Sequence, residues 1–185
     1  MFGLLAAIAP ALGGRGLART VDGPPVFRTA RRQFTQIEPA QSLPAVTLTD
    51  LEGRAARLAA VPGKVLLINV WATWCAACKI QLPLLERFQA ATGQVQVAAV
   101  SVDEAAPAAV GAYVEALSLR SLQIYLDPDG ALASRSADNR APLALLGLPI
   151  TYLITPSGQI AGFMAGCVDW LAPDAQRLLA YYGAA

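Results

Sequence analysis

The stretch from Val65 to Cys78 constrains the fold more than any other part of the chain. It begins as a run of branched apolar residues, which is typical of a strand buried on both faces of a sheet. It ends in two tryptophans and a Cys-x-x-Cys pair, Cys75 and Cys78, and the residues that follow favour a helix. The pair is therefore expected where a buried strand passes into a helix N-terminus. The N–H groups there favour a thiolate, and the pKa of cysteines in such pairs is lowered from about 8.5 to roughly 3.5–7.5. Cys75 is thus a candidate nucleophile.

The cysteine and histidine content narrows the chemistry further. The chain has 185 residues, three cysteines and no histidine. The absence of histidine excludes Cys–His and Ser–His nucleophile pairs and histidine metal ligands. Three cysteines are too few for a framework of several disulfides, and a zinc site would need a carboxylate or water as its fourth ligand. A close pair with a distant third cysteine, Cys167, favours redox chemistry, and we expect neither a metal nor a cofactor.

Charge and apolar patterning indicate whether the chain binds nucleic acid, spans a membrane or is exported. The net charge of +1 gives no indication of nucleic-acid binding. No apolar run reaches the roughly 20 residues that a membrane-spanning helix needs. Residues 1–14 resemble the apolar region of a secretory signal without its basic start, and we favour an export segment over a membrane-anchor remnant or a loose tail. Residues 15–40, with arginines among Gly and Pro, are predicted to be a linker or a lightly tethered arm, which leaves 41–185 as the folded domain.

Beyond residue 43, strand and helix patterns alternate. The helix after the cysteine pair should end at Gly93, and a second is predicted over about 105–118, with one or two short helices within 131–146. A hairpin is predicted over 150–165, and a last helix begins at Asp169 or Pro173. Further strands are predicted over 45–48, 95–102 and 122–126. This order predicts an α/β fold whose central mixed sheet has helices on both faces.

The string Trp-Ala-Thr-Trp-Cys-x-x-Cys over residues 71–78 resembles thioredoxin-fold proteins, in particular the TlpA/ResA/DsbE branch of exported thiol–disulfide oxidoreductases. A second match covers residues 147–154, where the family places a cis-proline before a strand. The tail over 166–179 is most similar to the TlpA subgroup. The resemblance covers roughly residues 34–183 and implies a three-layer thioredoxin-like fold.

The resemblance also implies roles for individual residues. Cys75 would attack a disulfide of a partner protein, and Cys78 would then attack Cys75 and release the reduced partner. Trp74 would shield the thiolate, and the loop of Leu148 and Pro149 would receive an extended substrate segment. An ordinary trans proline is the alternative at Pro149, and a structural disulfide or half of a zinc site is the alternative for the cysteine pair. We predict a cis bond and a redox-active pair.

Three positions depart from the family pattern. Gln81 stands where the family usually has a carboxylate, Asn69 stands where thioredoxins have an aspartate, and Ala77 replaces a proline. Neither amide can relay a proton, so we expect slow attack by Cys78. Gln81 is expected either to hydrogen-bond near Cys78 or to face solvent. Lys79 is expected to be a solvated cation that slightly favours the thiolate of Cys75. Cys167 is expected to be a half-buried hydrophobe, and the alternative is that it acts as a resolving thiol.

The resulting functional hypothesis is a periplasmic reductant of protein disulfides, with the N-terminal segment as a potential membrane anchor. The resemblance implies partners in cytochrome assembly, namely cytochrome oxidase copper-site proteins or apocytochrome c, and a membrane thiol-reductase of the DsbD/CcdA kind as electron donor. The alternatives are a thiol peroxidase, a copper chaperone and a redox-silent binding module of the same fold. The first lacks its Thr-x-x-Cys motif here, and the second lacks both Cys-x-x-x-Cys and histidine.

Overall fold

The computed structural model describes residues 23–136 and 140–184. The described residues form ten strands: β1 (Thr35–Ser42), β2 (Val46–Thr49), β3 (Ala55–Leu58), β4 (Val65–Trp71), β5 (Val95–Ser101), β6 (Gln123–Leu126), β7 (Ala133–Ser134), β8 (Leu143–Ala144), β9 (Ile150–Ile154) and β10 (Gln159–Ala165). Three helices accompany them: α1 (Ala76–Ala91), α2 (Pro107–Ala116) and α3 (Pro173–Gly183). None of these helices is long and apolar enough to cross a membrane. The predicted export segment lies outside the described residues.

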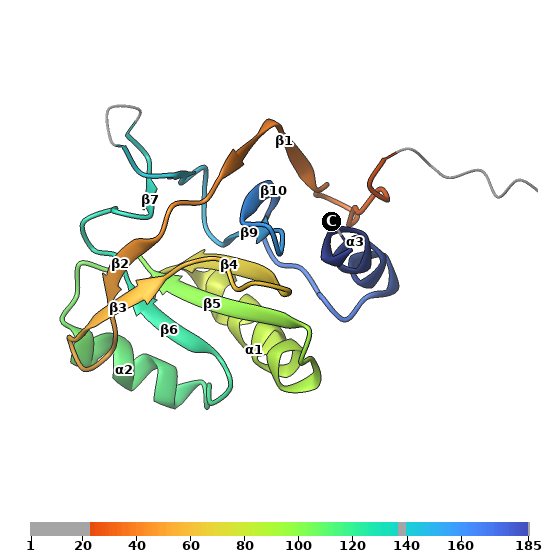
Figure 1. Cartoon of the computed structure of the whole chain (residues 1–185). Coiled ribbons are helices and arrows are strands. Elements are labelled where there is room, and N and C mark those ends of the chain that lie inside the picture. The colour runs from red at the N-terminus through yellow and green to blue at the C-terminus, as the bar shows by residue number, and fades with distance from the viewer. Residues whose placement is uncertain (1–22, 137–139, 185) are drawn as a thin grey trace, which may run out of the picture.

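Strand β4 lies at the centre of an eight-stranded mixed sheet with the order β1-β10-β9-β4-β5-β6-β2-β3 (Figure 1). It pairs in parallel with β5 and antiparallel with β9, and all of its side chains are buried. This burial on both faces explains the continuous apolar run in the sequence. The predicted hairpin is confirmed as β9 and β10.

The two faces of the sheet bury two separate cores. Because side chains alternate along a strand, Leu67 and Trp71 of β4 point to one face and Leu66 and Ile68 to the other. The first core, here called the helix-side core, receives buried residues from α1, α2 and α3. The second core contains no residue of these helices. The predicted α/β fold with a central mixed sheet and flanking helices is confirmed, but the prediction of helices on both faces is wrong, because α1, α2 and α3 all contribute to the helix-side core.

The segment that follows β6 covers the second face and is not helical where the structure describes it. Short helices were predicted within 131–146, but β7 and β8 pair there in parallel. The Asp127 carboxylate accepts hydrogen bonds from the N–H groups of Ala131, Leu132 and Ala133, which competes with helix formation. Leu132 and Leu143 fill the second core. The prediction of a helix was therefore wrong because a buried carboxylate organises this segment.

The predicted arm over residues 15–40 is part of the domain from Phe27 onward. Phe27 and Phe34 are buried in the helix-side core, and β1 pairs antiparallel with β10. The close approach of β1 depends on Gly162, because a Cβ atom there would collide with the Thr35 carbonyl oxygen. The boundary expected at residue 41 thus falls inside β1. Two isolated phenylalanines among Arg, Gly and Pro form no periodic pattern, so the sequence did not predict that this arm packs against the domain.

Candidate active site

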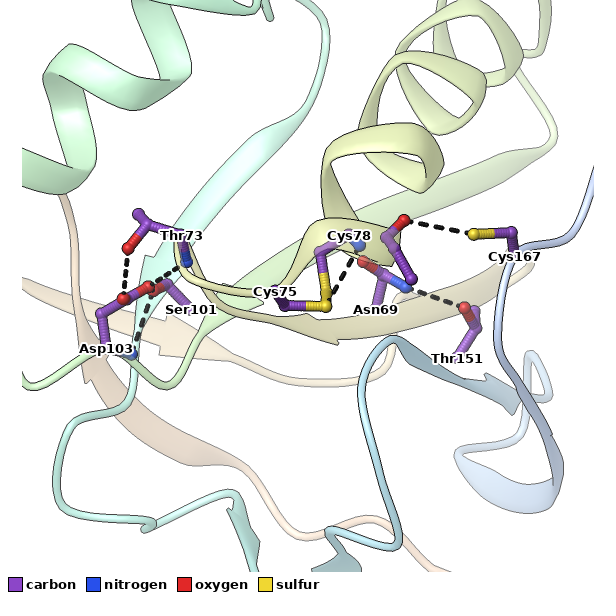
Figure 2. Close-up of a disulfide and its surroundings, with 9 residues drawn as sticks. Asn69, Thr73, Cys75, Cys78, Ser101, Asp103, Thr151 and Cys167 are labelled. Carbon is purple, nitrogen blue, oxygen red and sulfur yellow. Dashed lines mark hydrogen bonds between the residues drawn. A yellow bond between two sulfur atoms is a disulfide. The ribbon is translucent and has the colours of Figure 1, made fainter.

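Cys75 and Cys78 lie where β4 passes into α1, as the sequence predicts (Figure 2). Cys75 is the N-cap of α1, and its Sγ accepts a hydrogen bond from the Cys78 backbone N–H at 3.1 Å. The two cysteines form a disulfide, with their Cα atoms 5.2 Å apart. A sulfur at a helix N-terminus faces unpaired N–H groups and the positive end of the helix dipole, which stabilises a thiolate once the disulfide is reduced.

The two sulfurs differ in their access to solvent. Cys75 retains 8% of its surface exposed, whereas Cys78 is fully buried. The neighbouring Trp74 is 66% exposed, so an apolar platform lies beside the accessible cysteine. Trp71 is fully buried and stacks on Tyr113, so this tryptophan belongs to the core.

The Leu148–Pro149 peptide bond is cis, as predicted. Pro149 is buried and Leu148 is half-buried against both cores. The Pro149 carbonyl accepts a hydrogen bond from the Gly166 N–H at 2.7 Å, which ties this loop to the segment that follows β10.

A buried carboxylate holds the loop that leads to Cys75. Asp103 Oδ2 accepts hydrogen bonds from the Thr73 N–H at 2.9 Å and from Ser101 Oγ at 2.6 Å, while its Oδ1 accepts one from Thr73 Oγ1 at 2.6 Å (Figure 2). Asp103 itself is only 4% exposed. Two of these bonds hold the backbone and the side chain of Thr73, two residues before Cys75, and the third ties Asp103 to Ser101 at the end of β5. Asp103 therefore fixes the approach of the chain to Cys75.

Sequence reasoning missed Asp103, although a signal for it exists. It follows β5, and β4 and β5 run in parallel, so their carboxyl ends meet at the same edge of the sheet. Polar residues directly after neighbouring parallel strands are expected to lie together at that edge. The Ser101-x-Asp103 pattern after the predicted strand 95–102 could thus have placed this carboxylate beside Thr73.

Asn69 lies in β4 and is completely buried. Its Nδ2 donates to Thr151 Oγ1 at 2.9 Å, which links β4 to the neighbouring β9. Its Oδ1 has no hydrogen-bond partner. The amide position singled out from the sequence is therefore buried beneath the cysteine pair and only half satisfied.

Gln81 does not face solvent. It is fully buried in α1, where its Nε2 donates to the Val168 carbonyl at 3.1 Å and its Oε1 accepts from the Val168 N–H at 2.6 Å. The side chain thus binds the backbone of the segment after β10 through both of its polar atoms. This clamp, which the sequence did not reveal, holds Cys167 close to the cysteine pair.

Cys167 is half-buried, and its Sγ donates to the Ala77 carbonyl at 3.1 Å (Figure 2). Burial raises the pKa of its thiol, which favours the protonated form that makes this bond. Lys79 is exposed at the surface of α1. Within the described ranges, no three His, Cys, Asp or Glu side chains are grouped so that they would hold a metal ion.

A Cys-x-x-Cys disulfide at a helix N-terminus, a cis-proline loop and a mixed sheet together define the thioredoxin-fold thiol–disulfide oxidoreductases. A closed Cys75–Cys78 pair can exchange with external thiols and disulfides, and this is the chemistry that the site supports.

The chain belongs to the AhpC/TSA family, whose model matches residues 39–163. It is 34% identical over 144 residues to the thiol:disulfide interchange protein DsbE of Pseudomonas aeruginosa, which covers 74% of each chain. It is 28% identical over 132 residues to the thiol-disulfide oxidoreductase ResA of Bacillus subtilis, which covers 70% of this chain and 69% of ResA. These likenesses confirm that the protein is a thiol–disulfide oxidoreductase of the ResA/DsbE kind. Membership of the TlpA subgroup stays a prediction.

A solved structure has the same fold. The crystal structure of a thiol:disulfide interchange protein, a thioredoxin family protein from Chlorobium tepidum, matches with a TM-score of 0.60 and covers 80% of this chain and 99% of that one. The two sequences are 19% identical, so this match supports the fold alone.

Proposed function

We propose that this protein reduces disulfide bonds of partner proteins, with Cys75 as the nucleophile and Cys78 as the resolving cysteine. The observation that carries the proposal is the asymmetry of the pair: Cys75 caps the helix and is the more accessible, while Cys78 is fully buried behind it. An external disulfide can therefore reach Cys75, and only an internal attack can use Cys78.

The reaction balances as two exchanges. The Cys75 thiolate attacks one sulfur of the partner disulfide, a mixed disulfide forms, and the other partner sulfur leaves as a thiolate. Cys78 then loses its proton to solvent and attacks Cys75 Sγ. This closes the Cys75–Cys78 disulfide and releases the second partner sulfur. The partner gains two electrons, and the pair loses two.

Substrate binding is proposed at the surface beside Cys75. Trp74 provides exposed apolar area, and the loop of Leu148 and Pro149 provides a half-buried and a buried residue next to it in the family arrangement. We propose that an extended segment of the partner lies across these residues, since extended peptides bind through their backbone and alternate side chains.

Single-cysteine variants test the roles directly. Reduction of a model protein disulfide should disappear in both Cys75→Ser and Cys78→Ser, but only Cys78→Ser should accumulate a mixed disulfide with the substrate. Accumulation in Cys75→Ser instead would exchange the two roles. Unchanged reduction by a variant with both cysteines replaced would refute the enzymatic proposal.

The direction of electron flow has its own measurement, the redox equilibrium with glutathione. A reduction potential near that of thioredoxin, roughly −270 mV, supports a reductant, whereas one near that of DsbA, about −120 mV, would identify an oxidant.

We further propose that the protein acts in the periplasm on cytochrome oxidase copper-site proteins or apocytochrome c, with a membrane thiol-reductase as electron donor. The support is the likeness to the ResA/DsbE branch. Cells that produce Cys78→Ser should yield mixed disulfides whose partner chains can be identified. Trapping of cytosolic proteins alone would contradict the proposed compartment and partners.

A further inference from the structure

Asn69 carries a buried carbonyl oxygen that lacks a hydrogen-bond donor. In the part of the chain that the structure describes, the buried side-chain atoms without a partner are Asn69 Oδ1, Trp71 Nε1, Tyr113 Oη and Trp170 Nε1. Asn69 Oδ1 is the one carbonyl oxygen in this described set. An unsatisfied buried acceptor costs free energy and therefore calls for a physical explanation.

The orphaned oxygen lies on the same face of the sheet as Cys78. Side chains alternate along β4, so Asn69 points to the face that receives Leu67 and Trp71, and both of these belong to the core that contains Cys78. Figure 2 shows Asn69 beneath the first turn of α1, with its nitrogen turned to Thr151 and its oxygen on the side of Cys78.

Two polar side chains close to the cysteine pair already have partners of their own. The Gln81 amide donates to the Val168 carbonyl, and the Cys167 thiol donates to the Ala77 carbonyl. Asn69 uses its own nitrogen for Thr151. In the disulfide form, Cys78 Sγ carries no hydrogen. Reduction is the event that gives this sulfur a proton to donate.

We propose that Asn69 is a positioning residue that accepts a hydrogen bond from the Cys78 thiol in the reduced protein and thereby favours the reduced form. This inference deepens the proposed function and rests on it for the role of Cys78. The side-chain oxygen of Asn69 gains a hydrogen-bond donor only after reduction, so the amide stabilises the dithiol relative to the disulfide. The same bond keeps the buried thiol protonated while Cys75 carries the charge.

The redox step balances with glutathione as reductant. Two glutathione thiols supply two electrons and two protons and become one glutathione disulfide. The Sγ–Sγ bond breaks, Cys78 Sγ takes one proton and donates it to Asn69 Oδ1 in a hydrogen bond, and Cys75 remains a thiolate as the other proton enters solvent.

The test compares the redox equilibrium of the full chain with that of Asn69→Leu, which removes the acceptor at similar volume. One net buried hydrogen bond corresponds to about a tenfold change in an equilibrium constant. The ratio of reduced to oxidised protein at a fixed glutathione ratio should fall about tenfold, which moves the potential about 30 mV more negative. A ratio within twofold of the parent would overturn the inference.

Thr151→Val is the matched control. It removes the partner of Asn69 Nδ2 but leaves Oδ1 in place. A structural link between β4 and β9 stabilises both redox forms equally, so this variant should lose stability and keep its redox equilibrium within twofold. A shift in Thr151→Val as large as that in Asn69→Leu would assign the effect to the strand link instead.

A measurement on the parent protein avoids any folding defect of the variants. In isotope-labelled protein, the side-chain carbonyl resonance of Asn69 should move to higher frequency on reduction with dithiothreitol, because that oxygen gains a donor. No movement, or movement to lower frequency, would contradict the inference. The proposed function fails by a different result, namely a parent protein that equilibrates with glutathione but reduces no protein disulfide.

Discussion

The two flanks of the Cys75–Cys78 disulfide differ in their polar side chains: one has a carboxylate and the other has amides. On the flank toward β5, the Asp103 carboxylate accepts three hydrogen bonds from Thr73 and Ser101. On the flank toward β9 and the segment after β10, the amide side chains of Asn69 and Gln81 make the hydrogen bonds to Thr151 and Val168. We call these the carboxylate flank and the amide flank.

This difference means that the group that anchors the loop before Cys75 is distinct from the groups that lie beside Cys78, whose proton is lost during the reaction. Both carboxylate oxygens of Asp103 are engaged by neighbours that hold the loop before Cys75. The amide flank lies against the buried Cys78, and neither amide titrates. The Asp103 carboxylate thus fixes geometry, and the proton of Cys78 is left to solvent. Four predictions test this division, in order of decreasing effect.

Asp103→Ala should show the largest effect. It leaves the Thr73 N–H and the Ser101 and Thr73 hydroxyls without their acceptor, and the loss of such a buried network should lower the free energy of unfolding by roughly 3 kcal/mol. Urea unfolding of the oxidised protein measures this. Asp103→Asn is the control, because its oxygen can replace Oδ2 and its amide can donate to Thr73 Oγ1 once that hydroxyl rotates. A loss in Asp103→Asn equal to that in Asp103→Ala would show that the charge, rather than the hydrogen-bond pattern, anchors the loop.

Gln81→Leu should lower the free energy of unfolding by about 2 kcal/mol, because both the N–H and the carbonyl of Val168 lose their partner. Lys79→Ala, on the exposed side of the same helix turn, should change it by less than about 0.5 kcal/mol. Chemical denaturation of both variants provides the comparison. Equal stabilities would mean that Val168 is held without the Gln81 clamp.

Gln81→Glu should make stability depend on pH. Only the protonated acid can both donate to the Val168 carbonyl and accept from its N–H, so the folded-state pKa of this carboxyl should rise above its ordinary value of about 4.3. A raised folded-state pKa means that the native state binds more protons than the unfolded state. The variant should therefore match the parent most closely at low pH and lose stability as pH rises through the folded-state pKa. The measurement is the difference in unfolding free energy between variant and parent as a function of pH. A difference that grows toward low pH would refute the prediction.

Cys167→Ala should have the smallest effect. The change removes one weak bond to the Ala77 carbonyl and a half-buried sulfur, for which we expect a loss of at most about 1 kcal/mol and unchanged disulfide reduction. Burial raises the pKa of this thiol, so alkylation of Cys167 in the parent should be slow at neutral pH. Loss of turnover in Cys167→Ala would assign it the resolving role that was the alternative prediction.

The sequence could predict the parts of the site that depend on local pattern. The apolar run of β4, the helix after it and the hairpin of β9 and β10 follow from residue periodicity and turn residues. The cis bond before Pro149 followed from the family resemblance, since the local sequence alone favours the trans form. These features involve neighbours in the chain or a specific motif.

The parts that sequence reasoning missed depend on contacts between distant residues. Gln81 meets Val168 across 87 positions, and Thr73 meets Asp103 across 30. Nothing in the local pattern of Gln81 distinguishes a buried clamp from a surface amide. The non-helical segment around β7 and the packed arm before β1 were also missed, because Asp127 and the two phenylalanines act only through the folded structure.

The stretch from Val65 to Cys78 determined by itself that a buried strand leads into a helix whose first turn carries two cysteines. Branched apolar side chains, helix-forming residues and Cys-x-x-Cys spacing act over a few residues, so no tertiary information is needed. Only the tertiary structure decided what surrounds the pair. The carboxylate anchors a loop and an amide oxygen stays unsatisfied, because hydrogen bonds between sheet strands and helices depend on which residues the fold brings together.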